Sequence, residues 1–124
     1  MPGKTHQPKW LPKVEEHDFA AAESYLALIF PHAQCKTLVA ALRATDIVQF
    51  KAKDIFRASQ LSLLGISNSH VEKDRAQINK GQALSPILLV REQNIGRVIV
   101  ADGYHRLCAV YQVDEDAWIP CKIV

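Results

Sequence analysis

The sequence predicts a small α+β domain in which a mixed β-sheet is packed with helices, preceded by an N-terminal helical hairpin. Two segments, 19–30 and 31–44, carry apolar residues at helical spacing. Two apolar runs, 87–90 and 98–101, are typical of buried strands, and the polar turn 92–96 between them indicates a β-hairpin. With 124 residues, 48% of them hydrophobic, the chain is long enough to bury one core.

The overall composition excludes several classes of protein. A net charge of +2, from 15 basic and 13 acidic residues, does not indicate general nucleic-acid binding. No apolar stretch approaches the length of a membrane span, and the N-terminus lacks the apolar core of a signal peptide. Cys35, Cys108 and Cys121 form no Cys-x-x-Cys pair. We therefore expect a reduced, cytoplasmic protein without membrane contact.

The chain is expected to divide into an arm and one domain. Residues 1–17 predict a loose, basic, Pro-containing arm, in which Trp10 favours docking on the body. Residues 18–124 predict a single α+β domain, with the helical hairpin at 18–45 and the core at 46–124.

Local signals define the remaining elements. Asp18 is placed to cap the first helix, and Pro31 to open the second. Next we expect, in chain order, a short strand at 47–50, one or two helical turns at 53–58, and a packed loop at 59–69.

A charged helix is expected at 70–80. Ser69 and Glu72 match a capping box, in which each side chain bonds the other residue's backbone N–H. Gly81 is placed to end this helix in a left-handed cap. Its charged surface predicts a face toward solvent or a partner.

The C-terminal third predicts a helix at 104–112 and a last strand at 119–124. Pro120 is compatible with that strand near its start or at a sheet edge. If the strands 98–101 and 119–124 are parallel, the helix between them makes a right-handed crossover.

The turn between strand and helix, Asp102-Gly103-Tyr104-His105-Arg106, is the candidate functional site. Gly103 allows a sharp turn and a close ligand approach, and a helix start attracts anions through its free N–H groups. Arg106 can grip a phosphate bidentately, and His105 can contact a phosphate or transfer a proton. Asp102 can hold a metal ion or orient Arg106.

Each of these residues also has a structural interpretation. Asp102 can cap the helix, His105 can be a hydrogen-bonded surface residue, and Arg106 can pair with Asp102 or with Glu115 and Asp116. A helix start alone adds about 0.3–1 kcal/mol, whereas millimolar binding needs about 4 kcal/mol. Other donors must therefore converge. The candidates are Ser67, Asn68, Ser69, His70 and Lys73.

Two further chemistries have weaker support. The helix start and Arg106 would favour a reactive Cys108 thiolate, but Cys108 lies on the stripe expected to pack. A metal site of His70, His105 and Asp102 has no recognised ligand spacing behind it.

The residues Asp102-Gly103-Tyr104-His105-Arg106-Leu107-Cys108-Ala109 resemble the motif of the ParB/sulfiredoxin superfamily. Partition proteins of this superfamily carry Gly-x-Arg-Arg, sulfiredoxins Gly-Cys-His-Arg, and free-serine kinases Asp-Gly-His-His-Arg. The similarity extends loosely over residues 46–124 and implies a ParB/sulfiredoxin-like fold. It also implies that the helix start binds nucleotide phosphates (CTP, ATP or ADP) through Gly103, His105 and Arg106.

The positions at which this sequence differs from the family motif reduce the number of activities that the resemblance implies. Tyr104 stands at the sulfiredoxin cysteine position, so that reductase activity is not expected. Partition proteins continue into a helix-turn-helix domain, whereas this sequence ends at Val124, so direct DNA binding is not expected. For a kinase-like base, Glu72 and Asp74 are the nominees.

Together these observations predict a nucleotide- or phosphate-binding protein, with an ATPase or small-molecule phosphotransferase reaction left open. Asp102, His105 and Arg106 are the candidate catalytic residues, and Asp102 the candidate Mg²⁺ ligand. The alternatives are a non-catalytic protein-interaction module and a nucleic-acid accessory factor. The candidate ligand-binding residues are Gly103, Tyr104, His105, Arg106, Ser69, His70 and Lys73.

Overall fold

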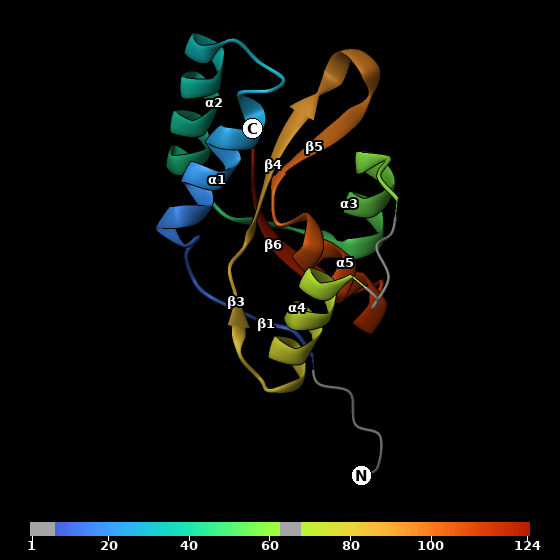
Figure 1. Ribbon diagram of the computed structural model, residues 1–124. Helices are drawn as coiled ribbons and strands as arrows, with labels where there is room; N and C mark the ends of the chain where they lie inside the picture. Colours follow the sequence, from blue (N-terminus) through green and yellow to red (C-terminus); the bar gives the residue numbers. More distant parts are fainter. Residues whose placement is uncertain (1–6, 63–67) are drawn as a thin grey trace.

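The computed structural model describes residues 7–62 and 68–124, and in these ranges a four-stranded mixed sheet lies between two layers of helices (Figure 1). The strand order is β2-β6-β4-β5. β6 and β4 are parallel, and the other two pairs are antiparallel. The predicted mixed α+β class is therefore confirmed. The strands are β2 (Val48–Lys51), β4 (Ile87–Glu92), β5 (Arg97–Asp102) and β6 (Trp118–Ile123).

The predicted hairpin is confirmed as β4 and β5, which a short 3₁₀ turn, η1 (Gln93–Ile95), connects. Gly96 closes this turn with φ 63°, a left-handed conformation that favours glycine. The register slips by one residue between Leu88 and Leu89, so that Leu88 lies opposite Asp102 and Leu89 opposite Val100. This bulge sits at the end of β5 that leads into the candidate site.

The last strand is confirmed, but its predicted topology is wrong. β5 and β6 are not parallel neighbours, because β4 lies between them and is itself the parallel partner of β6. The helix after β5 therefore does not complete a crossover between β5 and β6. Pro120 lies in β6 before Cys121, the first residue paired with β4, so its missing N–H falls outside that ladder.

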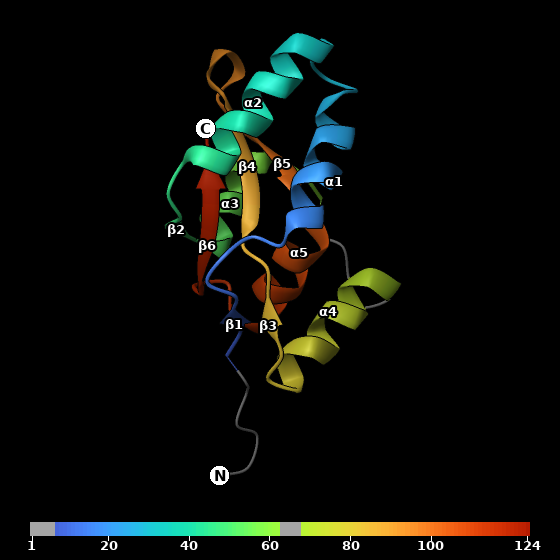
Figure 2. The same ribbon diagram turned by 90° about the vertical axis from the view of Figure 1, so that its left-hand side faces the viewer.

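The N-terminal helical hairpin covers one face of the sheet (Figures 1 and 2). It consists of α1 (Glu16–Leu26) and α2 (His32–Ala44). The first helix begins and ends earlier than the predicted span of 19–30, so Asp18 lies in its first turn and is not its cap. The buried residues of this layer are Phe19, Ala22, Leu26, Cys35, Val39 and Leu42, against Leu88, Val90, Ile99 and Ala101 of the sheet.

Three helices form the layer on the other face: α3 (Ala52–Ser59), α4 (Ser69–Asn79) and α5 (Tyr104–Val113). Ile55, Val71 and Leu107 are among the buried residues that pack on Ile87 and Leu89 of β4. The strand expected at 47–50 and the turns expected at 53–58 are confirmed within about one residue as β2 and α3. Of the loop expected at 59–69, residues 63–67 lie outside the described residues, and its two end residues belong to α3 and α4.

The ends of α4 confirm one predicted signal and correct another. Gly81 has φ 73° and donates to the Ile78 carbonyl, while Gln82 donates to the Gln77 carbonyl, which is the expected left-handed cap. The capping box was wrong: Asn68 is the N-cap, and its Oδ1 accepts from the amides of His70 and Val71. Ser69 is already the first helical residue.

The N-terminal segment is not a loose arm over its described part. Strand β1 (Lys9–Trp10) pairs in parallel with β3 (Ala83–Leu84), below the main sheet in Figure 2. Trp10 packs against the core of the α3–α5 layer, so the docking expected for it is confirmed. Residues 1–6 of the predicted arm lie outside the described part. None of the described helices is long and apolar enough to span a bilayer.

Candidate functional site

The site is built on the turn that joins β5 to α5. Strand β5 ends at Asp102, α5 begins at Tyr104, and Gly103 between them has φ 106°. A Cβ on Gly103 would lie 2.9 Å from both Arg106 Nη2 and Ile87 Cγ1. The predicted strand–glycine–helix turn is therefore confirmed, and only glycine fits it without strain or a steric clash.

Helix α4 brings two of the expected donors to this turn. A cavity of about 170 Å³ is lined by residues of α4, of the turn and of α5: His70, Lys73, Asp74, Asp102, Gly103, His105 and Arg106. The sequence could not show whether the segment 67–73 reaches the turn. Of its candidate donors, His70 and Lys73 line the cavity. Ser69 does not, Asn68 is used as a cap, and Ser67 lies outside the described residues.

Two imidazoles face one another at the cavity. The rings of His70 and His105 lie 4.8 Å apart, centroid to centroid. Burial lowers the pKa of His105, with smaller lowering effects from the charges of His70 and Arg106, against a raising effect from Asp74. These surroundings therefore disfavour the protonated form of His105.

Asp74 is the better placed of the two nominees for a base. It lines the cavity, whereas Glu72 is exposed on α4 and does not. Burial raises the pKa of the Asp74 carboxyl, and the positive charge of Arg106 opposes that shift. A carboxyl of raised pKa at a polar cavity is a typical candidate for proton transfer.

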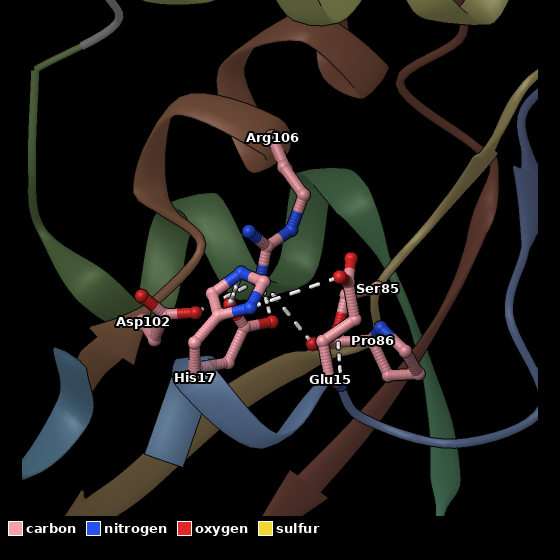
Figure 3. A network of polar contacts seen from close by, with 7 residues as sticks. Glu15, His17, Ser85, Pro86, Asp102 and Arg106 are labelled. Carbon is pink, nitrogen blue, oxygen red and sulfur yellow. Dashed lines mark hydrogen bonds and ion pairs between the residues drawn. The ribbon is translucent and has the colours of Figure 1, made fainter. Parts of the chain in front are cut away.

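Arg106 is held by three acceptors, all bonded to the same terminal nitrogen (Figure 3). Its Nη2 donates to Asp102 Oδ2 at 3.1 Å, to the Pro86 carbonyl at 3.3 Å and to Asp18 Oδ2 at 3.4 Å. The side chains of Arg106, Asp102 and Asp18 are only 17%, 17% and 5% exposed. The ion pair expected between Arg106 and Asp102 is therefore present, and Glu115 and Asp116 are not partners in it.

Sequence reasoning missed the role of Asp18. The residue precedes Arg106 by 88 positions, and its local pattern resembled a helix cap. The only signal available was an acidic residue one position before the apolar stripe of α1, and that position is also where a cap belongs. Nothing in the sequence distinguishes the two.

The arrangement does not fit a magnesium centre built by the protein. Asp102 Oδ2 is engaged by Arg106, and the described residues contain no group of three or more His, Cys, Asp or Glu side chains able to hold a metal ion. Burial raises the pKa of the Asp102 carboxyl, against the attraction of Arg106, and Asp18 raises it further. Mg²⁺ bound with a nucleotide would take most of its ligands from phosphate and water.

A second cavity adjoins the first and shares Asp102, Gly103 and His105 with it. Its volume is about 450 Å³, and α1 contributes Ala21 and Tyr25 to its wall. The other lining residues are Leu61, Val100, Ala101 and Tyr104. Tyr104 also donates a hydrogen bond to the Ser62 carbonyl. The Gly103 turn therefore contributes to both a polar cavity and a more apolar one.

Cys108 is fully buried in the core of the α3–α5 layer. Of the two roles considered for it, packing is the one that the structure shows.

No protein-family model, curated protein or solved structure matches the chain.

Proposed function

We propose that this chain binds the phosphate of a nucleotide, or of another phosphorylated small molecule, in the polar cavity between α4 and the start of α5. The observation that carries the proposal is convergence: His70 and Lys73 from α4 line the same cavity as Gly103 and His105. The resemblance of residues 102–109 to the ParB/sulfiredoxin motif supports the same site and the ATP, ADP or CTP class of ligand.

The energetics require this convergence. A helix start contributes about 0.3–1 kcal/mol, far below the roughly 8 kcal/mol of micromolar binding. Lys73 adds a full positive charge, and two imidazoles become donors and cations when protonated. Asp74 and Asp102 also line the cavity, and the Arg106–Asp102 ion pair offsets one of these two negative charges.

The second cavity supports a nucleotide over inorganic phosphate alone. It shares Gly103 with the polar cavity, and its lining includes apolar and aromatic side chains, among them Tyr25 and Tyr104. Aromatic rings of this kind stack on nucleobases. A ligand with its phosphate in the polar cavity would have room there for a sugar and a base.

The same cavity could also support a reaction of the bound nucleotide. An ATPase or phosphotransferase needs a base near the transferred phosphate, and Asp74 is the carboxyl whose position supports that role. Turnover of a bound nucleotide would distinguish an enzyme from a binding module.

The test is a titration of ATP, ADP, CTP, GTP and inorganic phosphate, with and without Mg²⁺, followed by thermal unfolding and calorimetry. A nucleotide at 100 times its dissociation constant should add about 2.7 kcal/mol to the free energy of unfolding. Lys73→Ala should weaken binding about tenfold or more, because a charge-assisted contact is lost. The control Lys80→Ala, an exposed lysine at the other end of the same helix, should bind as wild type does.

Absence of any response at millimolar ligand would contradict the proposal. A response unchanged by Lys73→Ala would place the ligand elsewhere on the molecule.

A further inference from the structure

We propose that Asp18, in the N-terminal helical hairpin, is a positioning residue that orients Arg106 for the ligand, so that the hairpin is part of the binding site. The effect on ligand binding rests on the proposed function, whereas the contact between Asp18 and Arg106 does not. The motif similarity begins only at residue 46, so the hairpin lies outside it.

The first turn of α1 points one carboxylate inward. Asp18 is 5% exposed, while Glu16 and His17, the two residues before it, are 77% and 74% exposed. A buried carboxylate is costly unless it is paired. Asp18 has two such contacts: the exposed His17, whose Nε2 lies 3.2 Å from Asp18 Oδ1, and the buried Arg106, whose Nη2 lies 3.4 Å from Asp18 Oδ2. Arg106 is the buried one of these two partners, so it is the contact that Asp18 makes on its inward side.

The backbone around Asp18 is fixed to the same segment that holds Arg106. The Glu15 amide donates to Ser85 Oγ at 3.0 Å, and Ser85 is itself buried. The next residue, Pro86, provides the carbonyl that accepts from Arg106. Two consecutive residues before β4 thus anchor both the start of α1 and the guanidinium (Figure 3).

The bulge in β5 completes the arrangement. It sets Asp102 opposite Leu88, whose side chain packs with α1 and α2. Asp102 and Asp18 then meet the same nitrogen, Arg106 Nη2, from β5 and from α1.

The consequence is an oriented guanidinium. All three acceptors use Nη2, so one end of the planar group is fixed and Nη1 is directed away from the acceptors (Figure 3). Arg106 Nε is buried and has no hydrogen-bond partner among the described residues, so the orientation is set from the Nη2 end. Because Arg106 also lines the polar cavity, Nη1 is the terminal nitrogen that a phosphate would use.

The competing explanation is that Asp18 and Arg106 form an ion pair that only stabilises the fold. The variant Asp18→Asn distinguishes this explanation from an orienting role. The asparagine keeps the size of the side chain and one carbonyl acceptor but removes the charge. The matched control is Glu16→Gln. Glu16 lies in the same helical turn as Asp18, and its carboxylate pairs with the exposed Arg43. If Asp18→Asn fails to fold, Asp18→Glu keeps the charge and changes its position.

Two readouts are measured on each full-length variant: the ¹⁵N NMR signal of the Arg106 guanidinium, assigned with Arg106→Lys, and the affinity for inorganic phosphate and ADP. We expect Asp18→Asn to shift the Arg106 signal and to speed rotation of its guanidinium, and to weaken ADP binding about tenfold. Asp18→Glu should show smaller changes of the same kind, and Glu16→Gln none.

An unchanged Arg106 signal and unchanged affinity in Asp18→Asn, with only a lower stability, would overturn the proposal in favour of a structural pair. If wild type binds no phosphate ligand but Asp18→Asn still alters the Arg106 signal, the orienting role stands and the proposed function alone fails.

Discussion

The protonation of His105 shows how single residues set the properties of the site. Its imidazole is partly buried beside His70, and Arg106 adds further positive charge nearby. These surroundings disfavour the imidazolium, and burial is the largest cause of the lowered pKa. The folded chain therefore binds fewer protons at this residue than the unfolded chain does, between the lowered pKa and the ordinary value of 6.5.

This difference predicts a pH dependence of stability. Because the unfolded state binds more protons in that window, the free energy of unfolding should fall as pH falls below about 6.5. His105→Gln should remove the part of this loss that comes from His105. The measurement is urea unfolding of both proteins at several values of pH between about 5 and 8. Parallel stability curves for the two proteins would show that His105 has no shifted pKa.

At this same scale, the sequence named the contiguous residues of the turn and nominated His70 and Lys73 of α4, but it could not show that α4 reaches the turn. Asp102, Gly103, His105 and Arg106 fall in one turn, so a local pattern could name them. Asp18 could not be named, because its partner lies 88 residues away and its position also suits a cap. Tertiary contact, and not local preference, decided its role.

At the scale of elements, helix ends depend on backbone angles that composition does not fix. Asn68 has φ −75° and ψ 124°, the extended conformation of an N-cap residue. Its side chain accepts hydrogen bonds from two backbone amides of the first turn. Both Asn68 and Ser69 are good capping residues, so sequence preference alone does not choose between them. Apolar runs are stronger signals, and β4, β5 and β6 were predicted within a few residues.

Mutation can distinguish the contributions of Asn68 and Ser69 to the stability of α4. Asn68→Ala should lower the free energy of unfolding by about 1 kcal/mol, since two amides lose their acceptor. Ser69→Ala should change it by less than about 0.5 kcal/mol, because Ser69 is an exposed helical position. Chemical denaturation of both variants checks the prediction. The reverse order of effects would restore the capping box.

At the scale of the whole molecule, a hydrophobic core lies on each face of the main sheet. The site lies where the α1–α2 layer and the α3–α5 layer meet. Asp18 comes from the α1–α2 layer, while His70, Lys73 and Arg106 come from the α3–α5 layer. The strand order that creates this meeting point could not be read from the sequence. Strand neighbours depend on which elements pack together, and β4 came to lie between β5 and β6.

A larger cavity elsewhere offers a rival place for an anion. It measures about 510 Å³ and includes Lys13, Arg43 and Lys122 in its lining. Two of these cations are already engaged, because Arg43 pairs with Glu16 and Lys122 donates to the Arg43 carbonyl. We therefore expect a phosphate to prefer the cavity at Gly103.

The most direct test of this account is a titration of the ¹⁵N-labelled chain with ADP, followed through its backbone amide NMR signals. The account predicts saturable shifts at Lys73, Tyr104 and His105, with Lys13 and Lys122 unmoved. Shifts confined to Lys13, Arg43 and Lys122, or no shifts at millimolar ADP, would contradict it.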